Sequence, residues 1–215
     1  FSRVVCEETV IRAQAGALLS QIAAQAQKSS LTGFEFAAGI PGTLGGAVTM
    51  NAGAYGGEMK DVLKSATVLT GDGQIRRLSA EELKLGYRTS IIKSGEYTVL
   101  EAEIGLERGD EEKIRSRMEE LREQRKTKQP LEYPSAGSTF KRPEGYFAGK
   151  LIMDAGLRGF CVGGAQVSEK HCGFVINTGD ATAADVVGLI REIQRRVEEQ
   201  FGVKLEPEVR FLGEF

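Results

Sequence analysis

The glycines of this sequence concentrate between Gly39 and Glu58, in the run GIPGTLGGAVTMNAGAYGGE. Six glycines in the nineteen positions after Gly39 are too many for an ordinary helix or strand. The run lacks the dinucleotide-binding GxGxxG pattern and the lysine of a P-loop. Backbone N–H groups in such a loop can still bind a phosphate or another anion. We therefore expect a ligand-binding loop, with a turn that only allows close packing as the alternative.

A second candidate is Ser138, in the segment PSAGSTFKRP between Pro134 and Pro143. An aromatic ring and two cations follow its hydroxyl, a combination that could present it to an anionic substrate. A nucleophilic serine needs a base, and the only histidine is His171. The nucleophile-elbow pattern GxSxG is also missing, so hydrolase chemistry has little support. The alternative is a polar turn capped by serine hydroxyls.

Arg88 and Glu208 are two further candidates. Arg88 follows an aromatic residue in GYRTS, where an arginine could hold a carboxylate or an enolate with two hydrogen bonds. A surface ion pair is the alternative. Glu208 lies in LEPEVRF, which we expect to be a strand with Glu206, Glu208 and Arg210 on one side. Such strand-edge carboxylates are usually only solvated, and an unusual environment would be needed to make one catalytic.

Composition narrows the class of protein. The chain has 215 residues, of which 41% are apolar and 27% charged, enough for one large domain or two small ones. The net charge is -2 with both signs interspersed, which argues against a nucleic-acid partner. No run of bulky apolar residues could span a membrane, and no signal peptide follows Phe1, which favours the cytoplasm. The start on Phe1 without an initiator Met suggests a fragment.

The cysteines do not predict a disulfide framework or a metal site. Cys6, Cys161 and Cys172 are an odd number without CxxC spacing, and we expect them to be buried free thiols. One histidine and three scattered cysteines cannot form a metal cluster, so we expect His171 to be structural.

Hydrophobic periodicity predicts the elements that position these residues. Strand patterns alternate with period two, a Gly71–Gly73 turn predicts a hairpin, and a capping box begins at Thr182. Because no regular βαβ repeat is seen, we expect an α+β fold. The charged helix at 110–128 should have a solvated face, with contact of Arg125, Lys126 or Lys128 to an anionic ligand as the alternative. The expected strands are 9–15, 65–70, 74–78, 97–106, 173–177 and 203–212, and the expected helices are 15–26, 110–128 and 182–197.

In this order, the glycine run, YRTS, PSAGSTFK and LEPEVRF resemble the UDP-N-acetylenolpyruvoylglucosamine reductase (MurB) family over nearly the whole chain. The sequence is similar to the shorter family type, which lacks an extra substrate-covering loop. The resemblance implies a lobe of an FAD-binding domain of the vanillyl-alcohol-oxidase (PCMH) type and a separate α+β substrate-binding domain. The implied parts are 1–108 as the second FAD lobe, 109–130 as connecting helix and linker, 131–204 as substrate-binding domain, and 205–215 as a C-terminal strand carrying a catalytic glutamate.

The resemblance also implies two cofactors, FAD and NADPH. NADPH reduces the flavin, whose N5 gives a hydride to the enolpyruvyl group of UDP-N-acetylglucosamine enolpyruvate, and the product is UDP-N-acetylmuramate for peptidoglycan. Ser138 corresponds to the donor of the proton that the resulting enolate needs, and Arg88 and Glu208 correspond to the pair that assists it. No obligate protein partner is implied. Family members begin with a further FAD-binding lobe that does not precede Phe1 here, so we expect this chain to bind FAD poorly.

The binding residues follow from the same resemblance. Tyr55 matches a position near the substrate, and Lys141 and Arg142 are expected to contact the sugar or the diphosphate. Longer-type relatives carry asparagine where Arg142 stands, so the diphosphate contacts are the least defined part of the match. The expected cofactor contacts are Gly39, Ile40, Pro41, Gly42, Thr43, Gly45, Gly46, Asn51, Gly53 and Ala54.

Two other functions stay open at this point. Another flavoprotein of the same superfold, such as an oxidase of a small alcohol, should lack PSAGSTFK and the partners Arg88 and Glu208. A non-catalytic module that binds a nucleotide sugar is the second alternative, because one flavin lobe is not present in the sequence.

Overall fold

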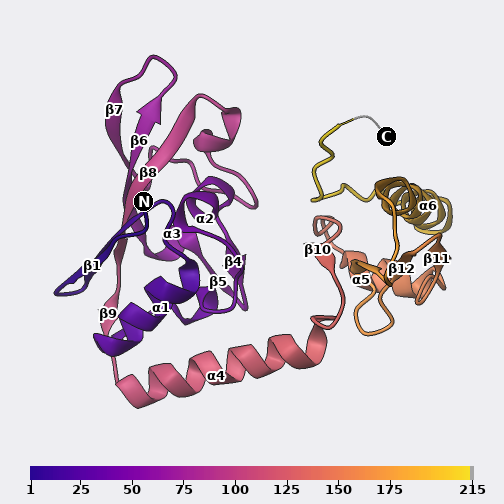
Figure 1. Cartoon of the computed structure of the whole chain (residues 1–215), viewed down its shortest axis with the longest axis horizontal. Helices are drawn as coiled ribbons and strands as arrows, with labels where there is room; N and C mark the ends of the chain where they lie inside the picture. The colour runs from indigo at the N-terminus through magenta and orange to yellow at the C-terminus, as the bar shows by residue number, and fades with distance from the viewer. Residues whose placement is uncertain (214–215) are drawn as a thin grey trace. The chain divides into compact units, whose positions relative to one another are not determined.

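A computed structural model describes residues 1–213 of the chain (Figure 1). The chain divides into two compact units at Arg125/Lys126, and each has its own hydrophobic core. Helix α4 (Glu111–Lys128) runs through the boundary and confirms the helix expected at 110–128. Its two buried residues, Ile114 and Leu121, form a narrow apolar stripe on an otherwise charged helix. No helix within 1–213 is long and apolar enough to cross a membrane.

The first unit is built on a five-stranded antiparallel sheet in the order β1-β2-β8-β6-β7. Helices α1 (Leu19–Lys28) and α2 (Leu44–Met50) lie on one side of this sheet in Figure 1. The core between them includes Ile11, Ile22, Leu44 and Ile104. The sheet confirms the four strands expected in this half of the chain. Its strands are β1 (Val4–Glu7), β2 (Val10–Gln14), β6 (Leu63–Thr70), β7 (Ile75–Ser79) and β8 (Tyr97–Gly105).

Strand β8 departs from the strict alternation that its sequence predicts. Alternation places Val99 on the solvated side with Glu101, but Val99 is buried. The pairing with β6 shifts between Thr67 and Val68, which face Glu101 and Val99, so Leu100 is an extra residue in β8. A bulge of this kind reverses which side chains point inward, and it brings Val99 into the core.

Short elements complete the first unit. They connect the sheet to the helices, and two of them contain the last part of the glycine run. They are β3 (Leu31–Thr32), β4 (Gly53–Ala54), β5 (Gly57–Glu58), α3 (Met59–Val62) and β9 (Glu107–Arg108), with 3-10 turns at Glu35–Ala37 and Ile91–Ser94.

The second unit combines a four-stranded sheet, in the order β10-β13-β12-β11, with two helices. Its core includes Ile152, Leu157, Leu189 and Ile193. The expected capping box opens α6, because Thr182 Oγ1 accepts from the Asp185 N–H at 3.1 Å and the Asp185 carboxylate accepts from the Thr182 N–H at 2.9 Å. The elements are β10 (Ser135–Ser138), α5 (Ala148–Asp154), β11 (Cys161–Val162), β12 (Ala165–Val167), β13 (Phe174–Asn177) and α6 (Ala183–Phe201).

The strand expected at 203–212 does not form. This segment is irregular, with a single antiparallel bridge between Pro207 and Phe140. Proline has no N–H to give to a sheet ladder, so the alternation around Pro207 cannot be satisfied as a regular strand. The inference that Glu206, Glu208 and Arg210 share one side of a pleat is therefore wrong.

The cysteines are not all buried as expected. Cys172 is buried, and its burial raises the pKa of its thiol. Cys6 is half-buried and Cys161 is exposed. All three are free thiols, as the absence of CxxC spacing predicted.

A cluster on α6 makes a testable prediction about charge. Hydrogen bonds from Arg195 and then from Arg196 lower the pKa of Glu192 from 4.5 to about 2. Because the folded-state pKa is depressed, the stabilisation by this cluster is complete above the unfolded pKa and is lost as the pH falls toward 2. An NMR titration of the Glu192 carboxyl carbon should therefore have its midpoint near 2. In the double variant Arg195→Gln and Arg196→Gln the midpoint should return toward 4.5; an unchanged midpoint would contradict this origin.

Candidate active site

The glycine run is not one open loop, as its composition predicted. Residues 44–50 form α2, so two of the glycines lie inside a helix. Helix α2 ends at Asn51, whose left-handed backbone (φ 43°) turns the chain into the β4-β5 hairpin. At the hairpin tip both Tyr55 (φ 53°) and Gly56 (φ 89°) are left-handed, which is the geometry of a type I′ turn. Local backbone geometry thus explains Asn51 and Gly56.

Three glycines of the run are required by packing inside the protein. A Cβ atom on Gly57 would lie 2.7 Å from the ring of Phe36, and one on Gly53 would lie 2.8 Å from Gly57 O. A Cβ on Gly45 would lie 3.0 Å from the Cβ of Ala15. For these positions the alternative of close packing is sufficient.

Gly46 cannot be explained in this way. It lies within α2 with an ordinary helical backbone, it is exposed, and a Cβ built on it would meet no atom within 4 Å. Glycine in a helix costs about 1 kcal/mol relative to alanine, and among the described residues no close packing at the position of a Cβ explains that cost. Gly42 also has open space around the position of a Cβ, but its backbone (φ 139°) by itself favours glycine, so Gly46 is the informative position. An exposed surface kept free of side chains suits the close approach of a flat ligand, so Gly46 fits a bound flavin.

Arg125 holds the beginning of the same segment. Its Nη1 donates to the carbonyl oxygen of Gly39, and a Cβ on Gly39 would lie 3.2 Å from Arg125 Nε. The Nε atom is buried and has no hydrogen-bond partner among the described residues. The sequence predicted a solvated side chain for Arg125, with an anionic ligand as the alternative partner. In the structure the guanidinium donates to a backbone carbonyl.

Arg88 lies at the tip of a second tight hairpin. The Gly86 and Thr89 backbones pair through two hydrogen bonds, Gly86 N to Thr89 O at 3.0 Å and Thr89 N to Gly86 O at 3.2 Å. Arg88 has a left-handed backbone (φ 53°), which is unfavourable for a residue with a side chain. Its guanidinium lies 5.3 Å from the centre of the Tyr87 ring. Strained residues of this kind concentrate at functional sites.

The Arg88 hairpin is fixed to the end of α2. Ser90 Oγ donates to Thr49 O at 2.7 Å, and Asn51 Nδ2 donates to Gly86 O at 3.1 Å. The structure therefore brings the glycine run and the Arg88 hairpin together within the first unit.

Ser138 lies at the end of β10, an edge strand of the second sheet. The pairing of β10 with β13 shifts between Ser135 and Ser138, and Gly137 there is left-handed (φ 82°). The segment is thus an edge strand with a bulge rather than the polar turn that was the alternative. Ser138 is exposed, and its hydroxyl makes no hydrogen bond to any residue in 1–213.

Glu208 lies beside Ser138 in the second unit. The Glu208 N–H donates to Thr139 O at 2.9 Å, one residue after Ser138, and Lys141 N donates to Glu206 O at 2.9 Å. These bonds flank the bridge between Phe140 and Pro207. The irregular segment therefore still places Glu208 next to the serine, although it is not the expected strand.

Lys141 and Arg142 follow directly. Lys141 forms an ion pair with Glu206, whose side chain is mostly exposed. The guanidinium carbon of Arg142 lies 4.0 Å from the centre of the Phe147 ring, a cation–π contact that was not expected. Both cations are thus oriented by neighbours on the same unit.

His171 has the contacts of a structural residue. Its ring packs edge-on against Phe174, with the two ring centres 5.1 Å apart. Its Nδ1 accepts a hydrogen bond from the Gly173 N–H at 3.1 Å. Partial burial lowers the pKa of this imidazole, which favours the neutral form. Within residues 1–213 no group of three or more His, Cys, Asp or Glu side chains could hold a metal ion.

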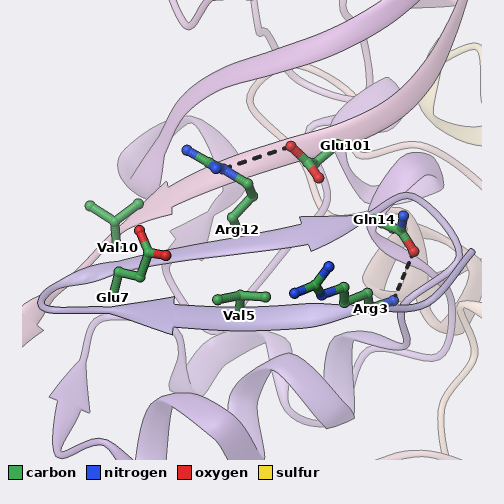
Figure 2. A pocket seen from close by; sticks show the side chains of 7 residues that line it. All are labelled: Arg3, Val5, Glu7, Val10, Arg12, Gln14 and Glu101. Atoms are coloured by element: carbon green, nitrogen blue, oxygen red, sulfur yellow. Dashed lines mark hydrogen bonds and ion pairs between the residues drawn. The ribbon is translucent and has the colours of Figure 1, made fainter.

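A hollow on the outer face of the first sheet contains none of the expected site residues (Figure 2). Arg3, Arg12, Glu7 and Glu101 line it together with apolar side chains of β1 and β2. The side chain of Arg12 pairs with Glu101 at 3.7 Å, and mixed charges of this kind do not select an anion. We therefore do not place the active site there.

Comparison with known proteins identifies both units. Residues 2–79 match the family described as FAD binding domain, and residues 129–212 match the family described as the C-terminal domain of UDP-N-acetylenolpyruvoylglucosamine reductase. These two matches confirm the expected fold class, an FAD-binding part followed by a separate C-terminal domain. The chain is accordingly an FAD-containing oxidoreductase.

The relatives define the family more closely. The chain is 66% identical over 210 residues to UDP-N-acetylenolpyruvoylglucosamine reductase of Lachnoclostridium phytofermentans, covering 97% of this chain and 68% of that protein. It is 64% identical over 206 residues to the reductase of Agathobacter rectalis, covering 96% and 66%. The crystal structure of the reductase from Thermus caldophilus has a TM-score of 0.78 at 41% identity, covering 90% of this chain and 70% of that one. The chain belongs to the UDP-N-acetylenolpyruvoylglucosamine reductase family, as its motifs predicted.

Proposed function

We propose that this protein reduces the enolpyruvyl group of UDP-N-acetylglucosamine enolpyruvate to give UDP-N-acetylmuramate, with NADPH as reductant and FAD as bound cofactor. The observation that carries the proposal is the position of Ser138, an exposed hydroxyl at a strand bulge beside Glu208. A hydroxyl in this position suits the transfer of a proton to a basic carbon. Relatives that share this unit bear the name of the reductase.

FAD held by the first unit would supply the hydride chemistry, with NADPH as the source of the hydride and the enolpyruvyl group as its acceptor. When the methylene carbon of the enolpyruvyl group gains a hydride, an electron pair remains on the carbon that carries the carboxylate. That carbon then needs one proton. We assign the donation of this proton to Ser138 Oγ, and solvent returns a proton to the serine oxygen.

Arg88 and Glu208 have supporting roles in this proposal. The guanidinium of Arg88 opposes the negative charge that the enolate shares with the neighbouring carboxylate. Its strained backbone holds the side chain at a hairpin tip, where Arg88 is only half-buried. Glu208 polarises or hydrogen-bonds the intermediate. Tyr55, at the tip of the β4-β5 hairpin, is proposed to lie near the substrate.

Lys141 and Arg142 are proposed to bind the sugar or the diphosphate. Lys141 is already paired with Glu206, so an incoming phosphate would replace the carboxylate of Glu206 as its anionic partner.

We also propose that residues 1–108 form an FAD lobe and that 109–130 connect it to a substrate-binding domain at 131–204, followed by the Glu208 segment. The substrates are soluble nucleotides, and the proposed location is the cytoplasm, with no protein, nucleic-acid or membrane partner required.

The cofactor contacts proposed for Gly39, Ile40, Pro41, Gly42, Thr43, Gly45, Gly46, Gly53 and Ala54 can be tested at one position. Gly46→Ala should stabilise the fold by about 0.5–1 kcal/mol, because alanine is the better helix former. It should also weaken FAD binding about tenfold, because the methyl group occupies the space of the ligand. Thermal unfolding and an FAD titration measure the two effects.

Gly57→Ala is the matched control for this test. Its methyl group would meet Phe36 at 2.7 Å, so it should destabilise the fold by about 1–3 kcal/mol. If Gly46→Ala instead destabilises the fold, or leaves the affinity for FAD unchanged, the open face of α2 is not a cofactor surface.

A purified preparation separates the reductase from the two alternatives. Yellow protein with flavin absorbance supports the reductase, whereas colourless protein that binds the UDP-sugar supports a binding module. The match of 129–212 to the reductase's own C-terminal domain already disfavours an oxidase of small alcohols.

A further inference from the structure

Asn51 connects three separate segments of the first unit through its side-chain amide. Its Nδ2 donates to Gly86 O at 3.1 Å and to the Glu58 carboxylate at 2.6 Å. Its Oδ1 accepts from the Lys60 N–H at 2.8 Å. The residue is 1% exposed. Both N–H groups of the amide are therefore used inside the protein, and they are not available to a ligand.

The partner of Asn51 is itself held in place. Glu58 forms an ion pair with Lys60, and this hydrogen-bonded carboxylate raises the pKa of the lysine. The bond from Asn51 to Glu58 has an ionised acceptor, which makes it stronger than a bond between neutral groups. The hydrogen bond to Glu58 thus fixes the orientation of the Asn51 amide, which also donates to the Gly86 carbonyl.

The Gly86 carbonyl is the base of the Arg88 hairpin. It accepts two hydrogen bonds, one from Thr89 N across the hairpin at 3.2 Å and one from Asn51 Nδ2 at 3.1 Å. Arg88 is left-handed within this two-residue tip, and Lys93 Nζ donates to its carbonyl at 3.2 Å. An unfavourable backbone of this kind persists only where the surroundings fix it.

We propose that Asn51 is a positioning residue for Arg88, which sets the place of the guanidinium relative to the glycine segment. The inference rests on the proposed function, since it assigns Asn51 to the substrate step. It also revises the expectation that the Asn51 side chain contacts the cofactor directly.

The variant that tests this is Asn51→Gly. Glycine keeps the left-handed backbone at the end of α2 and removes only the amide. NADPH-driven loss of FAD absorbance should keep its rate, while the return of absorbance with the enolpyruvyl UDP-sugar should slow about 10- to 100-fold, because small displacements of a catalytic group are costly. If the glycine variant does not fold, the double variant Asn51→Asp and Glu58→Gln is the second test. It keeps the acceptor for the Lys60 N–H and an amide–carboxylate contact between positions 51 and 58, removes the donor to Gly86 O, and should slow the same step.

A double-mutant cycle distinguishes positioning from general stability. In an Arg88→Ala background, Asn51→Gly should slow the substrate step no further, because the residue acts through Arg88. Ser30→Gly, which replaces another left-handed residue (φ 52°) after α1, should have no effect in either background. Equal losses from Asn51→Gly with and without Arg88 would overturn the proposal.

Hydrogen exchange tests the same inference without turnover. Exchange of the Thr89 amide should become at least several-fold faster in Asn51→Gly and remain unchanged in Ser30→Gly. If the unsubstituted protein does not reduce the UDP-sugar, the proposed function fails while this measurement still decides the inference. Unchanged Thr89 exchange would overturn it.

Discussion

Ser138→Ala should leave the NADPH-driven loss of FAD absorbance at its normal rate and slow the return of absorbance with the enolpyruvyl UDP-sugar by about 10²- to 10⁴-fold. That range is the usual contribution of a positioned proton donor. The reason is that the substrate can still accept a hydride, but the carbon beside the carboxylate has lost its source of a proton. Stopped-flow absorbance measures the two half-reactions separately.

Ser135→Ala is the matched control, since Ser135 is an exposed serine at the other end of β10. It removes the same atom from the same strand, and both half-reactions should proceed normally. A normal substrate step in Ser138→Ala would contradict the assignment of Ser138 as proton donor.

Arg88→Ala should lower kcat for the UDP-sugar by about 10²- to 10³-fold, the usual cost of removing one group that stabilises developing negative charge. Arg88→Lys should recover little of this loss, because an ammonium cannot make two parallel hydrogen bonds to a carboxylate. Steady-state kinetics with varied UDP-sugar gives kcat and KM for each variant.

Arg76→Ala provides the control for a lost positive charge, because Arg76 is exposed on β7 away from the site segments. A normal kcat is expected for it. If Arg88→Lys had the activity of the unsubstituted protein, charge alone would suffice and the bidentate role of Arg88 would be wrong.

Local signals in the sequence predicted the elements that depend on local chemistry. The capping box at Thr182 and Asp185 and the hairpin at residues 71–73 are each determined by residues within a few positions of one another. The bulge at Leu100 was out of reach, because β6 determines the register of β8 and lies far away in the chain. Its consequence, the burial of Val99, could only be seen once the strands were paired.

The glycine run shows the same limit for the site. The sequence predicts a ligand surface but cannot say which glycines face it, since Phe36 and Ala15 decide that through tertiary packing. Only the structure separates Gly46, which faces open space, from Gly57, which lies against a ring. The backbone of Asn51 did have a signal, because asparagine is one of the few residues other than glycine that adopt the left-handed conformation at a helix end. The hydrogen bond from its side chain to Gly86 O has no signal in the sequence.

Alternation was misleading at the C-terminal end. Pro207 is a local signal against a regular strand at 203–212, because proline cannot donate to a sheet ladder. The pairing that places Glu208 beside Ser138 nevertheless exists, and it depends on the bridge between Phe140 and Pro207. The pair was inferred from family resemblance, whereas its geometry follows from contacts that the sequence pattern does not contain.

The central claim is that this protein is an NADPH-dependent reductase of the enolpyruvyl UDP-sugar. The most direct measurement is NADPH oxidation with FAD present, with and without that UDP-sugar, on this chain and on a protein extended upstream to the length of its relatives. We predict oxidation that depends on the UDP-sugar, yields UDP-N-acetylmuramate and is lost in Ser138→Ala. NADPH oxidation that is the same without the UDP-sugar, or no oxidation by either protein, would contradict the claim.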